Sequence, residues 1–153
     1  MKLILFTSAS ERPRVIADSA IGRPVMPWFI PDFGENWRWR RATGVRIGRL
    51  GKGIAPKFAE RYIDGMTAFF VAEADGCATL DFMDNSVVIG SWLEPEGVGE
   101  TLPRLLVEAS RYATLKTGDV IALLDPAPAE PITAGGQISL SLNSKETLKL
   151  NLK

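Results

Sequence analysis

Residues 117–152 read TGDVIALLDPAPAEPITAGGQISLSLNSKETLKLNL, and this stretch decides the fold class. After a turn at 117–119, the apolar run Val120–Leu124 predicts a buried strand. Apolar and polar residues then alternate in Gln137–Leu142 and again in 147–152, which predicts two strands that each bury one face. The short polar segment between them predicts a hairpin. The C-terminal part of the chain is therefore expected to be β-structure.

The rest of the chain carries the signals of short strands that are separated by glycine and proline. Residues 21–33 contain three prolines and predict an extended loop. Apolar residues recur at helical spacing in 54–62 and in 102–112, which predicts two short helices. Further strands are predicted at residues 3–6, 45–50, 66–72 and 86–93. The fold class is mainly β with short helices.

Charge and cysteine content restrict the partners and the compartment. Lys plus Arg and Asp plus Glu both number 18, so the net charge is zero and neither nucleic acid nor an anionic membrane is an expected partner. No segment has the ~18 apolar residues that a membrane helix needs. Cys77 is the only cysteine and cannot form an internal disulfide. We expect a cytoplasmic protein.

The sequence contains no histidine, which removes several classes of chemistry. Histidine is the usual general base at neutral pH, the usual activator of a Ser or Cys nucleophile and the commonest metal ligand. Ser-His-Asp triads, Cys-His pairs and zinc sites that contain histidine are therefore excluded. Any reaction must depend on carboxylates, lysines, arginines, tyrosines or Cys77.

Three segments, taken together and in this order, resemble the catalytic domain of the fumarylacetoacetate hydrolase family. They are VRIGRLGKGIAPKFAERYIDGMTAFF at 45–70, DNSVVIGSWLEPE at 84–96 and the segment from 112 to 153. The resemblance implies a mixed β-sandwich roll that forms a homodimer. It also implies one domain over residues 1–153, with a divergent N-terminal strand and loop at 1–36 and the roll at 37–153.

The resemblance further implies a magnesium ion held by a Glu-x-Glu pair and an Asp, but this sequence departs from that pattern. The Glu-x-Glu positions fall on Arg40 and Ala42, and the Asp position falls at or near Val71. The family's lysine falls at or near Asp81, and its Thr-Gly-Thr-Pro-like segment corresponds to residues 122–126. A cationic side chain at a ligand position repels a metal ion. We therefore expect neither a metal site nor a magnesium cofactor.

The Trp- and Arg-rich segment at 37–41 has two interpretations. Arg40, together with Arg46 and Arg49, is a weak candidate for binding a small anion such as a carboxylate or phosphate. The favoured interpretation is structural: Trp37 and Trp39 lie on one face of a strand, and the arginines form a solvated face opposite.

Glu73, Asp75 and Asp81 are weak candidates for a catalytic base, since burial raises a carboxylate pKa toward neutrality. With Asp84 they form an acidic cluster whose spacing fits no EF-hand loop, and a polar loop is the simpler interpretation. Cys77 lacks an imidazole partner and is expected to be an unreactive thiol.

Three functional hypotheses follow from the sequence. The leading one is a non-catalytic or strongly diverged protein that keeps the family's dimer. The second is a hydrolase, decarboxylase or isomerase with a rebuilt site for a small 2-oxo or β-dicarbonyl acid. The third is a module that binds a small anion. For the dimer we expect Trp37 or Trp39 at or beside the contact, because one small roll holds too many large aromatics to bury completely: Trp28, Phe29, Trp37, Trp39 and Trp92.

Overall fold

The computed structural model describes residues 1–8 and 12–153. Most of this chain forms one mixed sheet with β8 beside β4 and the strand order β2-β1-β7-β4-β5-β6-β3. The pairs β1–β7 and β3–β6 are parallel, and the other pairs are antiparallel. The strands are β1 (Leu3–Phe6), β2 (Arg14–Ile16), β3 (Ile21–Gly22), β4 (Glu35–Ile47), β5 (Ile63–Asp75), β6 (Val87–Ile89), β7 (Val120–Leu124) and β8 (Glu130–Pro131).

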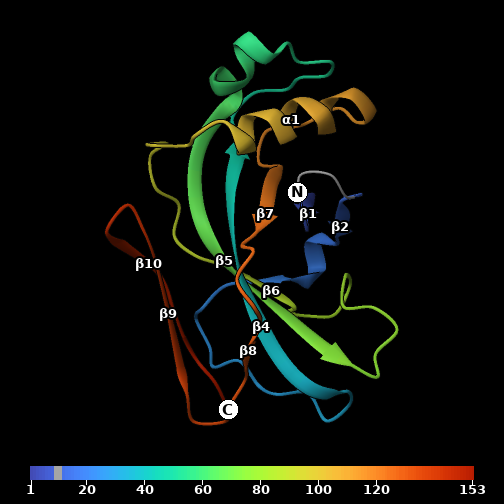
Figure 1. Cartoon of the computed structure of the whole chain (residues 1–153), viewed down its shortest axis with the longest axis vertical. Coiled ribbons are helices and arrows are strands. Elements are labelled where there is room, and N and C mark those ends of the chain that lie inside the picture. The colour runs from blue at the N-terminus through green and yellow to red at the C-terminus, as the bar shows by residue number, and fades with distance from the viewer. Residues whose placement is uncertain (9–11) are drawn as a thin grey trace.

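The sheet curves until it is nearly closed, and its two faces bury different side chains (Figure 1). Along β5, Phe69 and Val71 point to the inner face, whereas Ala68 and Phe70 point to the outer face, as strand geometry requires. The inner face gathers apolar side chains from β1, β2, β4, β5, β6 and β7 into one cluster. We call this the inner cluster. The fold therefore matches the predicted β-rich roll.

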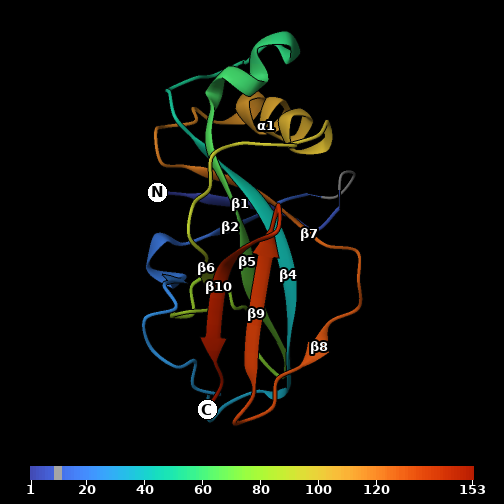
Figure 2. The ribbon, with the colours of Figure 1, turned by 90° about the vertical axis from the view of Figure 1, so that its left-hand side faces the viewer.

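The outer face of the sheet is covered at its two ends by different elements (Figures 1 and 2). At one end lie the α-helix α1 (Thr101–Tyr112) and the 3-10 helix η2 (Pro56–Tyr62). At the other end lies the separate hairpin of β9 (Gln137–Leu142) and β10 (Lys145–Asn151), whose apolar face packs on β4, β5 and β6. A second 3-10 helix, η1 (Asp18–Ala20), precedes β3. No helix in the described part of the chain has both the length and the apolar character needed to cross a bilayer.

The hairpin buries two of the five large aromatic side chains that the sequence analysis singled out. Trp28 and Trp37 are buried under it, with their rings 5.7 Å apart in an edge-to-face arrangement. Trp39 stacks on Phe70 with a centroid distance of 5.9 Å. As expected, the five large aromatics are not all buried: Phe29 is exposed, and Trp39 and Trp92 are partly buried.

Asp119, at the turn before β7, fixes the start of the chain to the sheet. Its buried carboxylate accepts hydrogen bonds from the backbone N–H of Lys2 (2.9 Å), the Nζ of Lys2 (2.7 Å) and the backbone N–H of Lys116 (2.8 Å). Burial alone would raise the pKa of this carboxyl, but these hydrogen bonds and the charge of Lys2 together lower it. Asp119 in the Gly-Asp turn therefore has a structural role: it connects Lys2, immediately before β1, to the start of β7.

Candidate functional site

The three positions at which the resemblance implies metal ligands do meet on the inner face of the sheet. Arg40 and Ala42 lie two residues apart on β4, and Val71 on β5 is the register partner of Arg40. Ala42 is 0% exposed and Val71 is 1% exposed, and both belong to the inner cluster. The backbone brings these three positions together, but two of them, Ala42 and Val71, have purely apolar side chains.

The space beside these positions is filled by Phe69. This residue is the register partner of Ala42 and is fully buried. Its ring lies against Gly44, where a Cβ atom would come within 2.7 Å of the Phe69 ring edge. The Trp92 ring packs edge-to-face against the same phenyl ring, with a centroid distance of 6.1 Å, and closes this end of the cluster. Apolar side chains pack the region where the resemblance implies a metal.

These residues do not fit a magnesium ion. Magnesium takes carboxylate, carbonyl or water oxygens in octahedral geometry, and Ala42 and Val71 offer no side-chain oxygen. Among residues 1–8 and 12–153, no group of three or more His, Cys, Asp and Glu side chains is placed to hold a metal. We derive no catalytic step through a metal.

Arg40 is held at the edge of the inner cluster by a network of ion pairs between β4 and β5. Its Nε donates to Glu73 at 2.6 Å, and its Nη1 donates to the carbonyl of Ala127 at 3.0 Å. Arg38, two residues earlier on the same face, donates to the second Glu73 oxygen at 3.3 Å and to Asp75 at 3.2 Å. The guanidinium of Arg40 therefore joins β4, β5 and the segment after β7.

Glu73, Asp75 and Asp81 are brought to this same end of the sheet, each with an arginine. Asp81 accepts two hydrogen bonds from Arg14, the shorter at 2.7 Å. A hydrogen bond from Asn36 and the charge of Arg38 lower the pKa of Asp75, the opposite of what a base that works near neutrality requires. A shallow cleft of about 330 Å³ runs between Glu73 and Asp81.

Two members of the acidic segment have other surroundings. Cys77 lines the same cleft and its Sγ lies 3.7 Å from the carbonyl of Asp75. Asp84 does not join the cluster: it is exposed and lines a different groove, together with Trp28 and Met26.

The three arginines proposed for anion binding are not brought together. Arg40 and Arg46 lie six positions apart along β4, which corresponds to about 20 Å in a strand. Arg46 donates to Asp64 at 2.7 Å and its guanidinium lies 4.8 Å from the Trp92 ring. Arg49 lies over the Tyr62 ring instead.

No protein-family model matches the sequence, and no curated protein matches it. Solved structures do match over 99% of the chain. The 5-carboxymethyl-2-hydroxymuconate delta-isomerase of Mycobacterium smegmatis superposes with a TM-score of 0.84 at 20% identity, and 78% of its chain is covered. The maleylpyruvate hydrolase of Sphingobium sp. SYK-6, in complex with manganese(II) and pyruvate, has a TM-score of 0.83 at 17% identity with 69% covered. A protein of Yersinia pestis CO92 assigned to the fumarylacetoacetate hydrolase family has a TM-score of 0.81 at 16% identity with 92% covered.

This chain has the fumarylacetoacetate hydrolase fold. Residues 122–126, where the resemblance implies a substrate-positioning segment, are mostly apolar. Ala122 and Leu124 belong to the inner cluster. Asp125 is the one acidic residue there; its partial burial raises its pKa, although Arg41 at 3.5 Å opposes the shift.

The sequence analysis missed Arg38 and Arg14, which hold the acidic side chains. A signal for Arg38 was present, because Arg38 and Arg40 alternate along one strand and Glu73 and Asp75 alternate along its neighbour. Arg14 gives no such signal, because it pairs with a carboxylate 67 residues away.

Proposed function

We propose that this protein is a non-catalytic user of the fumarylacetoacetate hydrolase fold, which acts by contact with other molecules and not by turnover. One observation carries the proposal: Ala42, Val71 and Phe69 form dry apolar packing where the resemblance implies metal and substrate. A Lewis acid and its substrate both need polar, accessible space. Since the chain also lacks histidine, no usual base compensates.

The charged residues at the edge of the inner cluster support the same conclusion. Glu73 is shared by two guanidinium groups, and the pKa of Asp75 is lowered by its partners. Arg40 donates hydrogen bonds to Glu73 and to the carbonyl of Ala127, and so connects β4 to β5 and to the segment after β7. These groups act as internal ties, which is a structural use of charge.

The test combines metal binding with turnover on the full chain. Calorimetric titration with Mg²⁺ and with Mn²⁺ is expected to give no stoichiometric binding. Assays of acylpyruvate cleavage and of oxaloacetate decarboxylation, each with added metal, are expected to give the rate of the protein-free control. Stoichiometric metal binding together with turnover would overturn the proposal.

A second candidate, an enzyme with a rebuilt site, is favoured only by the cleft between Glu73 and Asp81. This cleft of about 330 Å³ is lined by carboxylates and by the cations Arg14 and Arg38, a combination that suits a small 2-oxo acid. If the assays above detect turnover, Glu73→Gln and Asp81→Asn separate the two candidates. Loss of the rate in either variant would assign catalysis to that carboxylate.

A further inference from the structure

Two segments lie side by side at the end of the molecule that carries α1 and η2 (Figure 1). They are the loop 49–53, which follows β4, and the segment 110–116, which contains the end of α1. Gly51 and Leu115 exchange backbone hydrogen bonds in both directions, at 2.9 and 2.8 Å, and the N–H of Gly53 donates to the carbonyl of Ser110 at 2.8 Å. The two segments therefore form one surface on a fixed backbone.

The side chains that this surface exposes are cationic or apolar. Neither segment contains an aspartate or a glutamate. Leu50 is 66% exposed and Tyr112 is 75% exposed. Exposed cations accompany these two apolar side chains, and we call the whole set the cationic surface: Arg49, Leu50, Lys52, Arg111, Tyr112 and Lys116.

Most of the positive charge on the cationic surface is free. Arg111 pairs with Glu108 at 3.3 Å. In the part of the chain that the structure describes, Arg49, Lys52 and Lys116 form no ion pair with a carboxylate. Three charges beside two exposed apolar side chains are thus not neutralised within the protomer.

The zero net charge of the chain does not describe this surface. Exposed charges act over about 8 Å at physiological ionic strength, so a partner responds to the local charge and not to the sum over the chain. The expectation that an anionic membrane is not a partner depended on that sum. The local distribution of charge removes its basis.

We propose that the cationic surface docks on an anionic lipid bilayer, with Leu50 and Tyr112 in the headgroup region and the cations beside the lipid headgroups. Apolar side chains surrounded by Lys and Arg are typical of protein surfaces that bind at this interface, and tyrosine is enriched at headgroup level. The inference goes beyond the proposed function. It concerns a different surface and does not depend on whether the inner cluster binds a metal.

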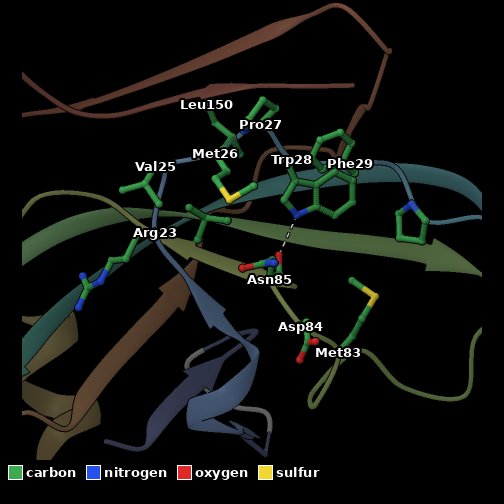
Figure 3. Close-up of a pocket in the computed structure, with 12 residues that line it drawn as sticks. Arg23, Val25, Met26, Pro27, Trp28, Phe29, Met83, Asp84, Asn85 and Leu150 are labelled. Carbon is green, nitrogen blue, oxygen red and sulfur yellow. Dashed lines mark hydrogen bonds between the residues drawn. The ribbon is translucent and has the colours of Figure 1, made fainter.

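The shape of the cationic surface favours a bilayer over a peptide or a nucleic acid. Peptides are commonly seated in a groove or along a sheet edge. The six side chains line neither the cleft at Glu73 nor the groove of about 300 Å³ at Met26 and Phe29, which we call the outer groove (Figure 3). Single-stranded nucleic acid stacks its bases on aromatic faces, but the Arg111 guanidinium already lies over the Tyr112 ring at 5.9 Å.

The first test measures binding of the full chain to lipid vesicles by co-sedimentation. One set of vesicles is phosphatidylcholine alone, and the other is phosphatidylcholine mixed with phosphatidylserine. We expect binding to the vesicles that contain phosphatidylserine, weaker binding as the salt concentration rises, and little binding to phosphatidylcholine alone.

The second test removes charge with Lys52→Gln/Lys116→Gln and uses Lys145→Gln/Lys149→Gln as its matched control. All four lysines are exposed and none has an ion-pair partner among the described residues, but Lys145 and Lys149 lie on β10. A lysine close to an anionic bilayer raises the partition coefficient about fivefold, so the first variant is expected to lower it about twentyfold. The control is expected to change it less than about twofold. Equal unfolding midpoints in urea show that both variants are folded.

The third test removes apolar contact with Leu50→Ser and uses Met26→Ser as its control. The two side chains are equally exposed, at 66% and 67%, but Met26 lies at the outer groove. Leu50→Ser is expected to lower the partition coefficient about tenfold, because the bilayer no longer buries the aliphatic side chain. Met26→Ser is expected to leave it unchanged.

Three outcomes would overturn the inference. Equal binding to both kinds of vesicle, or binding to neither, removes an anionic bilayer as the partner. A Lys52→Gln/Lys116→Gln or Leu50→Ser variant that binds like its control places the contact elsewhere. Binding to polyglutamate or to single-stranded DNA but not to vesicles assigns the surface to an acidic protein or to a nucleic acid. None of these outcomes affects the metal titration or the turnover assays, so this inference can fail while the proposed function stands.

Discussion

The inner cluster and the outer groove are both apolar, but they differ in access. Phe69 in the inner cluster is fully buried, whereas Phe29 at the groove is 59% exposed. The inner cluster is apolar where the resemblance implies polar ligands, and the groove is apolar where an isolated chain normally presents polar groups to water. The interior thus lacks the polar groups that the resemblance implies, and the surface at the groove carries apolar side chains in contact with water.

The charged groups inside and outside show a matching difference. Arg38 and Arg40, beside the inner cluster, are paired with Glu73 inside the protomer. Lys52 and Lys116, on the cationic surface, have no ion-pair partner in the described residues. Charges that are paired internally stabilise the chain, whereas unpaired ones are available for recognition. The difference separates the part that holds the fold from the part that we propose makes contacts.

The largest effect is expected from Phe69→Ala. The variant removes a fully buried ring from close packing, so the free energy of unfolding is expected to fall by about 3–5 kcal/mol in urea titrations. Phe82→Ala is the matched control, because this ring is 67% exposed, and its effect is expected to stay within about 0.5 kcal/mol. A loss of less than about 1 kcal/mol for Phe69→Ala would mean that the interior is loosely packed.

The next effect is expected from Asp119→Asn, which weakens the joint between Lys2 and β7. Charged hydrogen bonds of this kind contribute about 1.5–3 kcal/mol, and the variant is expected to lose that order of stability at pH 7. Because the pKa of Asp119 is lowered in the folded state, its contribution is present above the unfolded value of about 3.9. It is lost as the pH falls through the folded pKa.

The difference between wild type and Asp119→Asn should therefore close under acid conditions. Urea titrations at pH 7 and at successively lower pH measure this directly. A difference in unfolding free energy that does not change with pH would show that the asparagine destabilises the protein through poor packing or hydrogen-bond geometry and not through the loss of charge.

A smaller effect is expected from Arg40→Gln. The Arg40–Glu73 pair is partly buried and Glu73 keeps Arg38, so the loss is expected to be about 1 kcal/mol. Arg111→Gln, which breaks an exposed pair with Glu108, is the control and is expected to change stability by less than about 0.5 kcal/mol. Added Mg²⁺ should not raise the unfolding midpoint of Arg40→Gln. A magnesium-dependent rise would mean that Arg40 masks a latent cation site.

The fold was largely predictable where the alternation or run of apolar residues extends over a whole strand. Strands Leu3–Phe6, Val120–Leu124 and Gln137–Leu142 match their predicted ranges, because their apolar patterns span whole elements. Strand Val87–Ile89 is shorter than the 86–93 prediction, since the N–H of Ser91 leaves the β5 edge and donates to Thr147 at 2.6 Å. Strands of two or three residues, such as Ile21–Gly22, are too short to show a period.

The candidate site was predictable in part. The residue types at 40, 42 and 71 can be read along the chain, and the structure brings these three positions together on the inner face of the sheet. The helix predicted over 54–62 forms a 3-10 helix over Pro56–Tyr62. Exposure at Met26 and Phe29 was not predictable, since it depends on Trp28 bonding to the distant Asn85 and Asn151. Hydrogen bonds between residues so far apart in the sequence leave no local sequence pattern from which they could be predicted.

The smallest effect on the protomer is expected from Phe29→Ala. The ring is exposed, so at protein concentrations where the chain is monomeric the free energy of unfolding should change by no more than about 0.5 kcal/mol. The homodimer that the resemblance implies links association to folding, so the wild-type midpoint should rise with protein concentration. Phe29 is the most exposed of the five large aromatics, so the rise should be smaller for Phe29→Ala. Thermal unfolding over a series of concentrations measures both slopes. Equal slopes for the two proteins would remove Phe29 from the contact, whereas a concentration-independent loss of several kcal/mol would make it a core residue like Phe69.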